Sequence, residues 1–180
     1  MSGEQFARAF PLAIRTDVQV ATFGFPVTRL LGEEFSVRVG DEMVVRPHRI
    51  HNDPALIRLD HLTDLQRELI ACLLTRHTDG FVREQHLTRI IHSRNVWVPP
   101  FVVQLVGEYV IEILQVIKQN LRNLDMFTYG KFLRANPDFL VTTERRVISY
   151  WSCYYSEHKR DEYVGFQLLE FFKSLVRNSG

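Results

Sequence analysis

Residues 99–121 constrain the fold more than any other part of the chain, because they read as a helix that is apolar around most of its circumference. At about 100° per residue, the polar side chains share roughly a third of the circumference; they are Gln104, Glu108, Glu112, Gln115, Lys118, Gln119 and Arg122. The remaining apolar arc is far wider than the stripe of an ordinary surface helix. Neighbouring helices must cover at least two sides of this segment, so we expect it at the centre of a helical domain.

The start of this segment and its two glutamates limit the alternatives. Pro99 and Pro100 suit the first turn of a helix, where a missing backbone N–H costs nothing. A membrane span is disfavoured because Glu108 and Glu112 would each cost about 3 kcal/mol at the centre of a bilayer. A di-metal site would need Glu-x-x-His elements from other helices, and the sequence has none. We therefore interpret both glutamates as part of a polar seam that faces solvent or neighbouring Arg side chains, and we expect no membrane partner.

The rest of the chain predicts a mostly α (α+β) protein. Short β-favouring runs cover residues 18–25, 35–39 and 43–46, and Gly40 with Asp41 suits a tight turn between the last two. We expect residues 1–60 to form a β-rich N-terminal segment that packs on the helices. Residues 61–180 should form a helical domain, a bundle or irregular array of about six helices around the apolar segment.

Capping and breaking residues set the expected limits of the other helices. Thr63 and Gln66 form a capping box for a helix that runs to about residue 77. Asp79 and Gly80 then end that helix. Further helices are predicted over residues 82–93, 125–135, 142–158 and 163–177.

Candidate binding residues surround the turn at Asp79. Arg83 and His86 are three apart on one helix face, and with His77 they form a candidate anion-binding or acid–base site. Alternatively, Asp79 caps the next helix while the others form its wet face. The residues from Asp79 to Arg83 resemble the Asp…Val-Arg element of HEAT-type helical repeats. The resemblance covers five residues, and it implies that this Asp and Arg join successive repeats.

Six of the seven histidines lie between residues 48 and 92, which suggests a metal-dependent enzyme. In the sharpest form of that hypothesis, His51 and Asp53 are completed by a distant histidine as the facial triad of a non-haem iron site. The alternative is a surface loop in which Asp53 begins a turn. The sequence lacks a Gly-rich phosphate loop, a G-x-S-x-G elbow and a C-x-x-C pair, so we expect no cofactor.

Residues 63–93 can also be interpreted as a helix-turn-helix that binds nucleic acid. The second helix would present polar side chains to a major groove: Arg83, Gln85, His86, Thr88, Arg89 and His92. A net charge of +1 gives little excess of cations for phosphate contacts. Nucleic acid is therefore an alternative partner.

An aromatic cluster over residues 150–155 supplies the candidate protein interface. The i, i+4 spacing places Tyr150 over Tyr154 and Trp151 over Tyr155. We expect the second pair to continue a buried stripe, and the first pair, beside Arg146, to be partly exposed. Tyrosine and arginine are enriched among the residues that dominate binding energy in interfaces.

These observations favour a non-enzymatic protein-interaction domain, such as an adaptor or an inhibitor or immunity-type binding protein. The metal-dependent enzyme using residues 48–92 and the nucleic-acid-binding helix-turn-helix are the alternatives. Cys72 and Cys153 lie in apolar helical patterns, which predicts reduced, buried thiols. The N-terminus shows no signal-peptide or transit pattern. We therefore expect a cytoplasmic protein that binds a protein partner.

Overall fold

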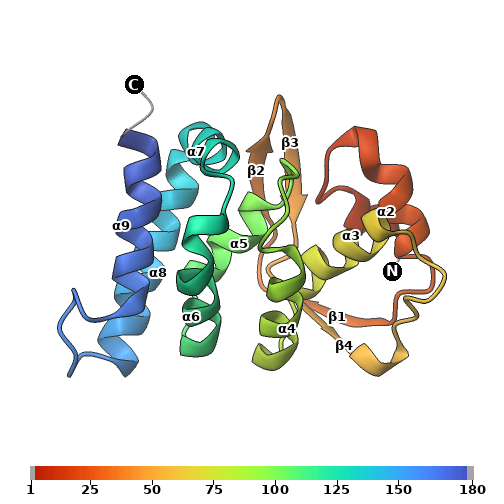
Figure 1. Cartoon of the computed structure of the whole chain (residues 1–180). Helices are drawn as coiled ribbons and strands as arrows, with labels where there is room; N and C mark the ends of the chain where they lie inside the picture. Colours follow the sequence, from red (N-terminus) through yellow and green to blue (C-terminus); the bar gives the residue numbers. More distant parts are fainter. Residues whose placement is uncertain (1–2, 178–180) are drawn as a thin grey trace. The chain divides into compact units, whose positions relative to one another are not determined.

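The computed structural model describes residues 3–177, apart from the side chains of residues 27 and 28. It confirms the predicted mostly α chain with a small β component (Figure 1). The described residues form nine α-helices and two antiparallel two-stranded sheets. They divide into two compact units, residues 1–90 and residues 91–180. Among the described residues, no helix combines the length and the apolar character that crossing a bilayer requires.

The first unit combines four helices with all four strands of the described chain. The helices are α1 (Gly3–Ala7), α2 (Arg15–Ala21), α3 (Asp64–Leu74) and α4 (Gly80–Ile90). The strands are β1 (Val27–Leu31), β2 (Phe35–Val39), β3 (Glu42–Arg46) and β4 (Arg49–Asn52). β1 pairs with β4, and β2 pairs with β3. Short 3-10 helices cover Leu12–Ile14 and Pro54–Leu56.

Two sequence predictions in this unit had opposite outcomes. The predicted hairpin is confirmed, with Gly40 at φ 60° in its turn, a left-handed conformation that glycine adopts without strain. The predicted strand over residues 18–25 is wrong, because residues 18–21 belong to α2 and residues 22–25 form no strand. Val18 and Ala21, three residues apart, are both buried in that helix. Packing of this face therefore overrides the β preference of the valines.

The turn after α3, residues 75–79, is bound to β4 along its backbone. Ile50 N–H donates to the Arg76 carbonyl at 2.8 Å, and Thr78 N–H donates to the Ile50 carbonyl at 2.9 Å. The fully buried Arg76 guanidinium adds two bonds to the His48 carbonyl, at 3.3 Å from Nε and 3.0 Å from Nη2. Because buried donors are costly without acceptors, these bonds hold the turn against the strand.

Arg46 is a second fully buried arginine, at the end of β3. Its guanidinium lies 4.8 Å from the centre of the ring of Phe35, its cross-strand partner in β2. This distance is within the range of a cation–π interaction. Cys72 of α3 is also fully buried, and burial, followed by the charge of Glu68, raises the pKa of its thiol well above the ordinary value. The predicted buried thiol is confirmed at Cys72.

The described part of the second unit is helical. It contains α5 (Pro99–Val106), α6 (Ile111–Asn120), α7 (Met126–Ala135), α8 (Pro137–Tyr154) and α9 (Val164–Arg177), with a 3-10 turn at Leu121–Asn123. α5 packs against the other four helices, and all eight of its residues are buried. Figure 1 shows α8 and α9 alongside each other, with α5 lying at an angle to them. The central position predicted for the apolar segment is therefore confirmed for α5.

The prediction of one continuous helix over residues 99–121 is wrong. The chain ends α5 at Val106 and begins α6 at Ile111. Gly107 caps the C-terminus of α5, and glycine is among the least favourable residues inside a helix. A Cβ on Gly107 would lie 3.0 Å from the Cβ of Arg146 on α8. The glycine therefore lets this connection approach α8 closely.

The break also changes which polar residues face solvent. Gln104 and Glu108, which were expected in the exposed seam, are each 1% exposed. Glu112, beyond the break, is exposed as predicted. A helical projection assumes that each residue is rotated by the same angle from the one before it. That regular rotation is interrupted at residues 107–110, so the projection fails for residues beyond the break. Of the α6 residues, only three are buried: Ile113, Leu114 and Ile117.

The remaining boundaries follow their capping signals. The capping box of Thr63 and Gln66 is present at the start of α3, and Asp125 caps α7. α8 starts earlier than the predicted residue 142, because Pro137 occupies its first turn, where the fixed φ of proline suits a helix. Cys153 in this helix is exposed, so the prediction that its thiol is buried is wrong.

Burial of α5 can be tested with one substitution and a matched control. Val103 is fully buried, so Val103→Asp would place an unpaired carboxylate among apolar side chains. We expect the free energy of unfolding to fall by at least about 3 kcal/mol, or folding to fail. Tryptophan fluorescence during urea denaturation reports on this unit, because Trp97 and Trp151 both belong to it.

The control is Gln119→Asp, which introduces the same side chain at an exposed position of α6. Its free energy of unfolding should change by less than about 0.5 kcal/mol. Equal denaturation midpoints for the two variants would contradict the burial of α5.

Candidate functional site

Three tyrosines from two parts of the second unit meet at the C-terminal end of α8. Tyr109 comes from the connection between α5 and α6, whereas Tyr150 and Tyr154 come from the last turns of α8. The ring centroid of Tyr109 lies 5.7 Å from that of Tyr150 and 6.0 Å from that of Tyr154, and the latter two are 6.3 Å apart. These are the distances of packed aromatic rings. These three residues are the tyrosine cluster.

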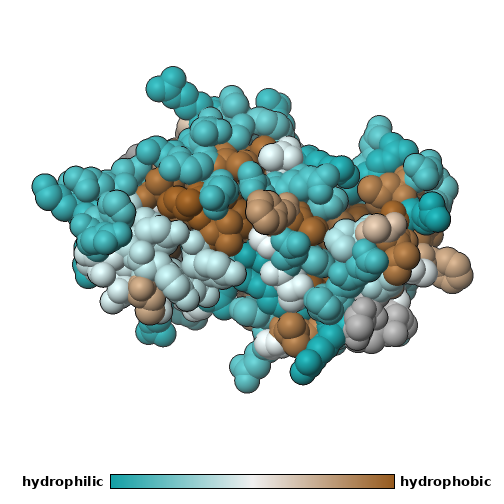
Figure 2. All heavy atoms as spheres, turned by 90° about the horizontal axis from the view of Figure 1, so that it is seen from below, coloured by the Kyte–Doolittle hydropathy of each residue, from teal (hydrophilic) through white to brown (hydrophobic). Residues whose placement is uncertain are grey.

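The tyrosine cluster lies at the surface. Tyr154 is 62% exposed and Tyr109 is 47% exposed, while Tyr150 is half-buried. On α8 the cluster continues a stripe that begins with the buried residues Thr143 and Val147, so the inward face of the helix runs out onto the surface. Over the part of the molecule where α8 and α9 lie, Figure 2 shows a pale area of intermediate hydropathy, the range of tyrosine, beside brown hydrophobic atoms.

The connection between α5 and α6 holds Tyr109 in place. The Tyr155 hydroxyl donates to the Tyr109 carbonyl at 3.0 Å. Burial, followed by the charge of Glu112, raises the pKa of Tyr155, so its phenol stays protonated as a donor. Sequence reasoning missed Tyr109 because it assigned the residue to the buried arc of an unbroken helix. Gly107, two residues earlier, is the signal that could have found it.

Arg146 borders the tyrosine cluster. It lies one turn before Tyr150 on α8. Its Cβ and Cδ lie next to Gly107, where a side chain on that residue would otherwise be. The residue is half-buried. Within the described residues, Arg146 forms no hydrogen bond or ion pair. The structure thus brings together the three interface candidates predicted from the sequence, Arg146, Tyr150 and Tyr154.

The connection from α8 to α9 packs beside the same end of α8. Trp151 Nε1 donates to the His158 carbonyl at 3.1 Å. The guanidinium carbon of Arg160 lies 4.9 Å from the Trp151 ring centre and 5.5 Å from that of Phe166. Trp151 and Tyr155 were predicted to be buried, and both are only half-buried.

Of the candidate residues at this turn in the first unit, Asp79 is exposed, whereas His77, Arg83 and His86 are buried. Asp79 Oδ1 accepts the Phe81 N–H at 2.8 Å, the capping role of the alternative interpretation. Arg83 is 1% exposed, and its Nη1 donates to the carbonyls of His77 and Thr78, at 2.9 Å each. The predicted wet face is therefore wrong for Arg83, which binds the turn of its own unit.

Two histidines beside this turn are also buried. His77 Nε2 donates to the Asn52 carbonyl at 3.0 Å, while Nδ1 accepts the Asp79 N–H at 2.9 Å. These partners make Nε2 the donor nitrogen and Nδ1 the acceptor nitrogen of the ring. His86 is 6% exposed, and burial, followed by the charges of Arg89 and His77, lowers its pKa to about 4. The His86 ring is therefore held neutral inside the unit.

The metal candidates His51 and Asp53 each have a local partner. His51 Nδ1 lies 2.9 Å from the Thr78 hydroxyl oxygen. Asp53 Oδ1 accepts the Ala55 N–H at 3.0 Å and begins a 3-10 helix, the turn of the alternative interpretation. No group of three or more His, Cys, Asp or Glu side chains with metal-binding placement occurs in residues 3–177.

α3 and α4 form the helical hairpin on which the nucleic-acid interpretation depends. Of the side chains proposed to face a major groove, Arg83 and His86 are buried. Gln85, Thr88 and Arg89 are exposed on α4. The hairpin therefore offers one exposed arginine, rather than two, from this set.

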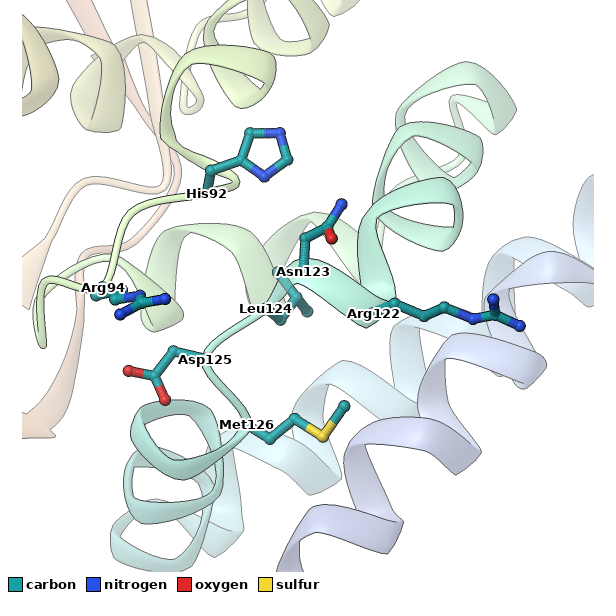
Figure 3. Close-up of a pocket in the computed structure, with 7 residues that line it drawn as sticks. All are labelled: His92, Arg94, Arg122, Asn123, Leu124, Asp125 and Met126. Atoms are coloured by element: carbon teal, nitrogen blue, oxygen red, sulfur yellow. The ribbon is translucent and has the colours of Figure 1, made fainter.

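A hollow of about 600 Å³ lies in the second unit, lined by His92, Arg94, Arg122, Asn123, Leu124, Asp125 and Met126. Figure 3 shows Arg94 and Arg122 on opposite sides of Leu124, with their guanidinium groups far apart. The Asp125 carboxylate already accepts two hydrogen bonds from Thr128, from its N–H at 3.3 Å and from its hydroxyl at 2.9 Å. The charged side chains that line the hollow do not point toward a common position where a ligand could bind. The tyrosine cluster is therefore the stronger candidate site.

Acid should destabilise the first unit through His86. Above pH 6.5 the ring is neutral in the folded and unfolded chain, and it contributes nothing to pH dependence. From pH 6.5 down to about 4 only the unfolded chain takes up the proton, which lowers the free energy of unfolding by up to about 3 kcal/mol. Urea denaturation from pH 6.5 to about 4 measures this fall in the free energy of unfolding, which should be absent in His86→Gln. Parallel pH profiles for wild type and variant would be the contrary result.

No family model, curated protein or solved structure matches this chain. Its function is therefore inferred from its own residues and their geometry.

Proposed function

We propose that this protein is a non-enzymatic protein-interaction domain, an adaptor or an inhibitor, that binds a partner protein through the tyrosine cluster. The observation that carries the proposal is the packing of three tyrosine rings against one another at the surface, with Tyr154 62% exposed. Tyrosine supplies a large contact area with few rotatable bonds, and it is enriched among residues that dominate binding energy. A partner that covers these rings removes apolar surface from water.

The support around the cluster favours binding with little rearrangement. Tyr109 is fixed by the hydrogen bond from Tyr155 and by the close approach that Gly107 permits. Tyr150 and Tyr154 belong to the 18-residue helix α8. Rings that already occupy their bound positions lose little conformational freedom on association, so more of the contact energy becomes affinity.

A cytoplasmic location belongs to the same proposal. Cys72 is free and fully buried, where it packs as an apolar side chain. Cys153 is free and exposed. Unpaired thiols suit a reducing compartment.

Affinity capture with matched baits tests the proposed interface. The baits are the wild type, the double variant Tyr150→Ser/Tyr154→Ser, and the control Phe127→Ser, which removes a 76% exposed aromatic residue from α7. Captured proteins are identified by mass spectrometry, then purified and titrated by calorimetry. We expect a partner whose affinity falls at least about tenfold with the double variant and stays unchanged with the control.

Two results would contradict the proposal. One is a set of partners that binds the double variant as tightly as the wild type. The other is the absence of any partner that distinguishes the wild type from the double variant while circular dichroism shows both to be folded.

A further inference from the structure

We propose that the partner presents an acidic segment to this surface, with a carboxylate bound by Arg146 and an adjacent apolar side chain covering the tyrosine cluster. This inference rests on the proposed function and adds the chemistry of the partner. It follows from the charges at the edge of the cluster.

Arg146 is the cationic group nearest to the cluster along α8. Its side chain is half-buried, and its carbons lie against the connection at Gly107. Among residues 3–177 it has neither a hydrogen-bond partner nor an ion-pair partner. A partly desolvated guanidinium gains more from a carboxylate than a fully exposed one does, and the planar group can bind both carboxylate oxygens.

The tyrosine hydroxyls are further hydrogen-bond donors on the same helix, α8. The hydroxyls of Tyr150 and Tyr154 form no hydrogen bond within the described chain. Tyr150 follows Arg146 by one helical turn, and side chains in a helix lean toward its N-terminus, so this ring leans toward the arginine. A carboxylate bound by Arg146 would therefore lie one helical turn from the first ring of the cluster.

A negative charge near Tyr155 favours a peptide over a nucleic acid. Glu112 is exposed, and its charge contributes to the raised pKa of Tyr155, which is bonded to the Tyr109 carbonyl. A single carboxylate needs only Arg146, which precedes Tyr155 by more than two helical turns along α8. A single-stranded nucleic acid with its bases stacked on the three rings would need several cations for its phosphates rather than one, and it would be repelled by a nearby carboxylate.

Selection from a phage-displayed library of random dodecapeptides tests the inference. The targets are the wild type, Arg146→Glu, the double variant Tyr150→Ser/Tyr154→Ser, and the control Arg145→Glu, which changes the neighbouring exposed arginine of α8. We expect the wild type and the control to enrich Asp or Glu next to an apolar residue. Arg146→Glu should instead enrich Lys or Arg, because the charge that the peptide meets is reversed.

Fluorescence anisotropy of the enriched peptide gives the quantitative readout. Its affinity should fall at least about tenfold with Arg146→Glu and remain within about twofold with Arg145→Glu. A consensus that lacks acidic residues, or one that is unchanged with Arg146→Glu, would overturn the acidic segment and leave tyrosine-dependent binding intact.

Other outcomes would reach further. Peptides enriched equally on the wild type and on the tyrosine double variant would overturn the proposed interface itself. Failure of the wild type to enrich any sequence would overturn the inference of a peptide segment. Tighter binding of a labelled oligothymidine than of any peptide, lost in the double variant, would assign the surface to nucleic acid and overturn the inference.

Discussion

The burial of α5 on every side is the constraint on which the second unit depends. All eight residues of the helix are buried, and the other four helices of the unit supply the cover. The helix ends at Val106, with Gly107 as its C-cap. The same glycine brings the connection against Arg146 of α8. The packing of one apolar helix thus determines where Tyr109 emerges, and Tyr109 completes the tyrosine cluster.

The two units use their polar residues in different ways. In the first unit Arg76, Arg83 and His77 are buried and donate to backbone carbonyls of β4, of the residue before it and of the turn after α3. Their hydrogen-bonding capacity is directed inward, which offsets the cost of burying them. In the second unit Arg146 and the tyrosine hydroxyls remain available at the surface. This contrast directs the functional interpretation to the second unit.

Sequence patterns predicted the class of fold and several boundaries because those depend on local chemistry. The capping box at Thr63, the turn at Gly40 and the apolar character of α5 were all read correctly. The burial of Arg83 and His86 could not be predicted, because the carbonyls that accept from Arg83 and the charges around His86 are arranged by tertiary packing. Tyr150 and Tyr154 were identified from their i, i+4 spacing. Tyr109 was missed because the periodicity of residues 99–121 concealed the break.

Hydrogen–deuterium exchange across residues 99–120 tests the central claim, that a fully buried α5 ends at Gly107 and the chain leaves the helix before α6. The account predicts slow exchange for the amides of residues 102–106, fast exchange at Tyr109 and Val110, which lie outside both helices, and renewed protection within α6. Uniform slow exchange through residues 107–111 would show an unbroken helix. That result would contradict both the packing described for α5 and the position of Tyr109 in the tyrosine cluster.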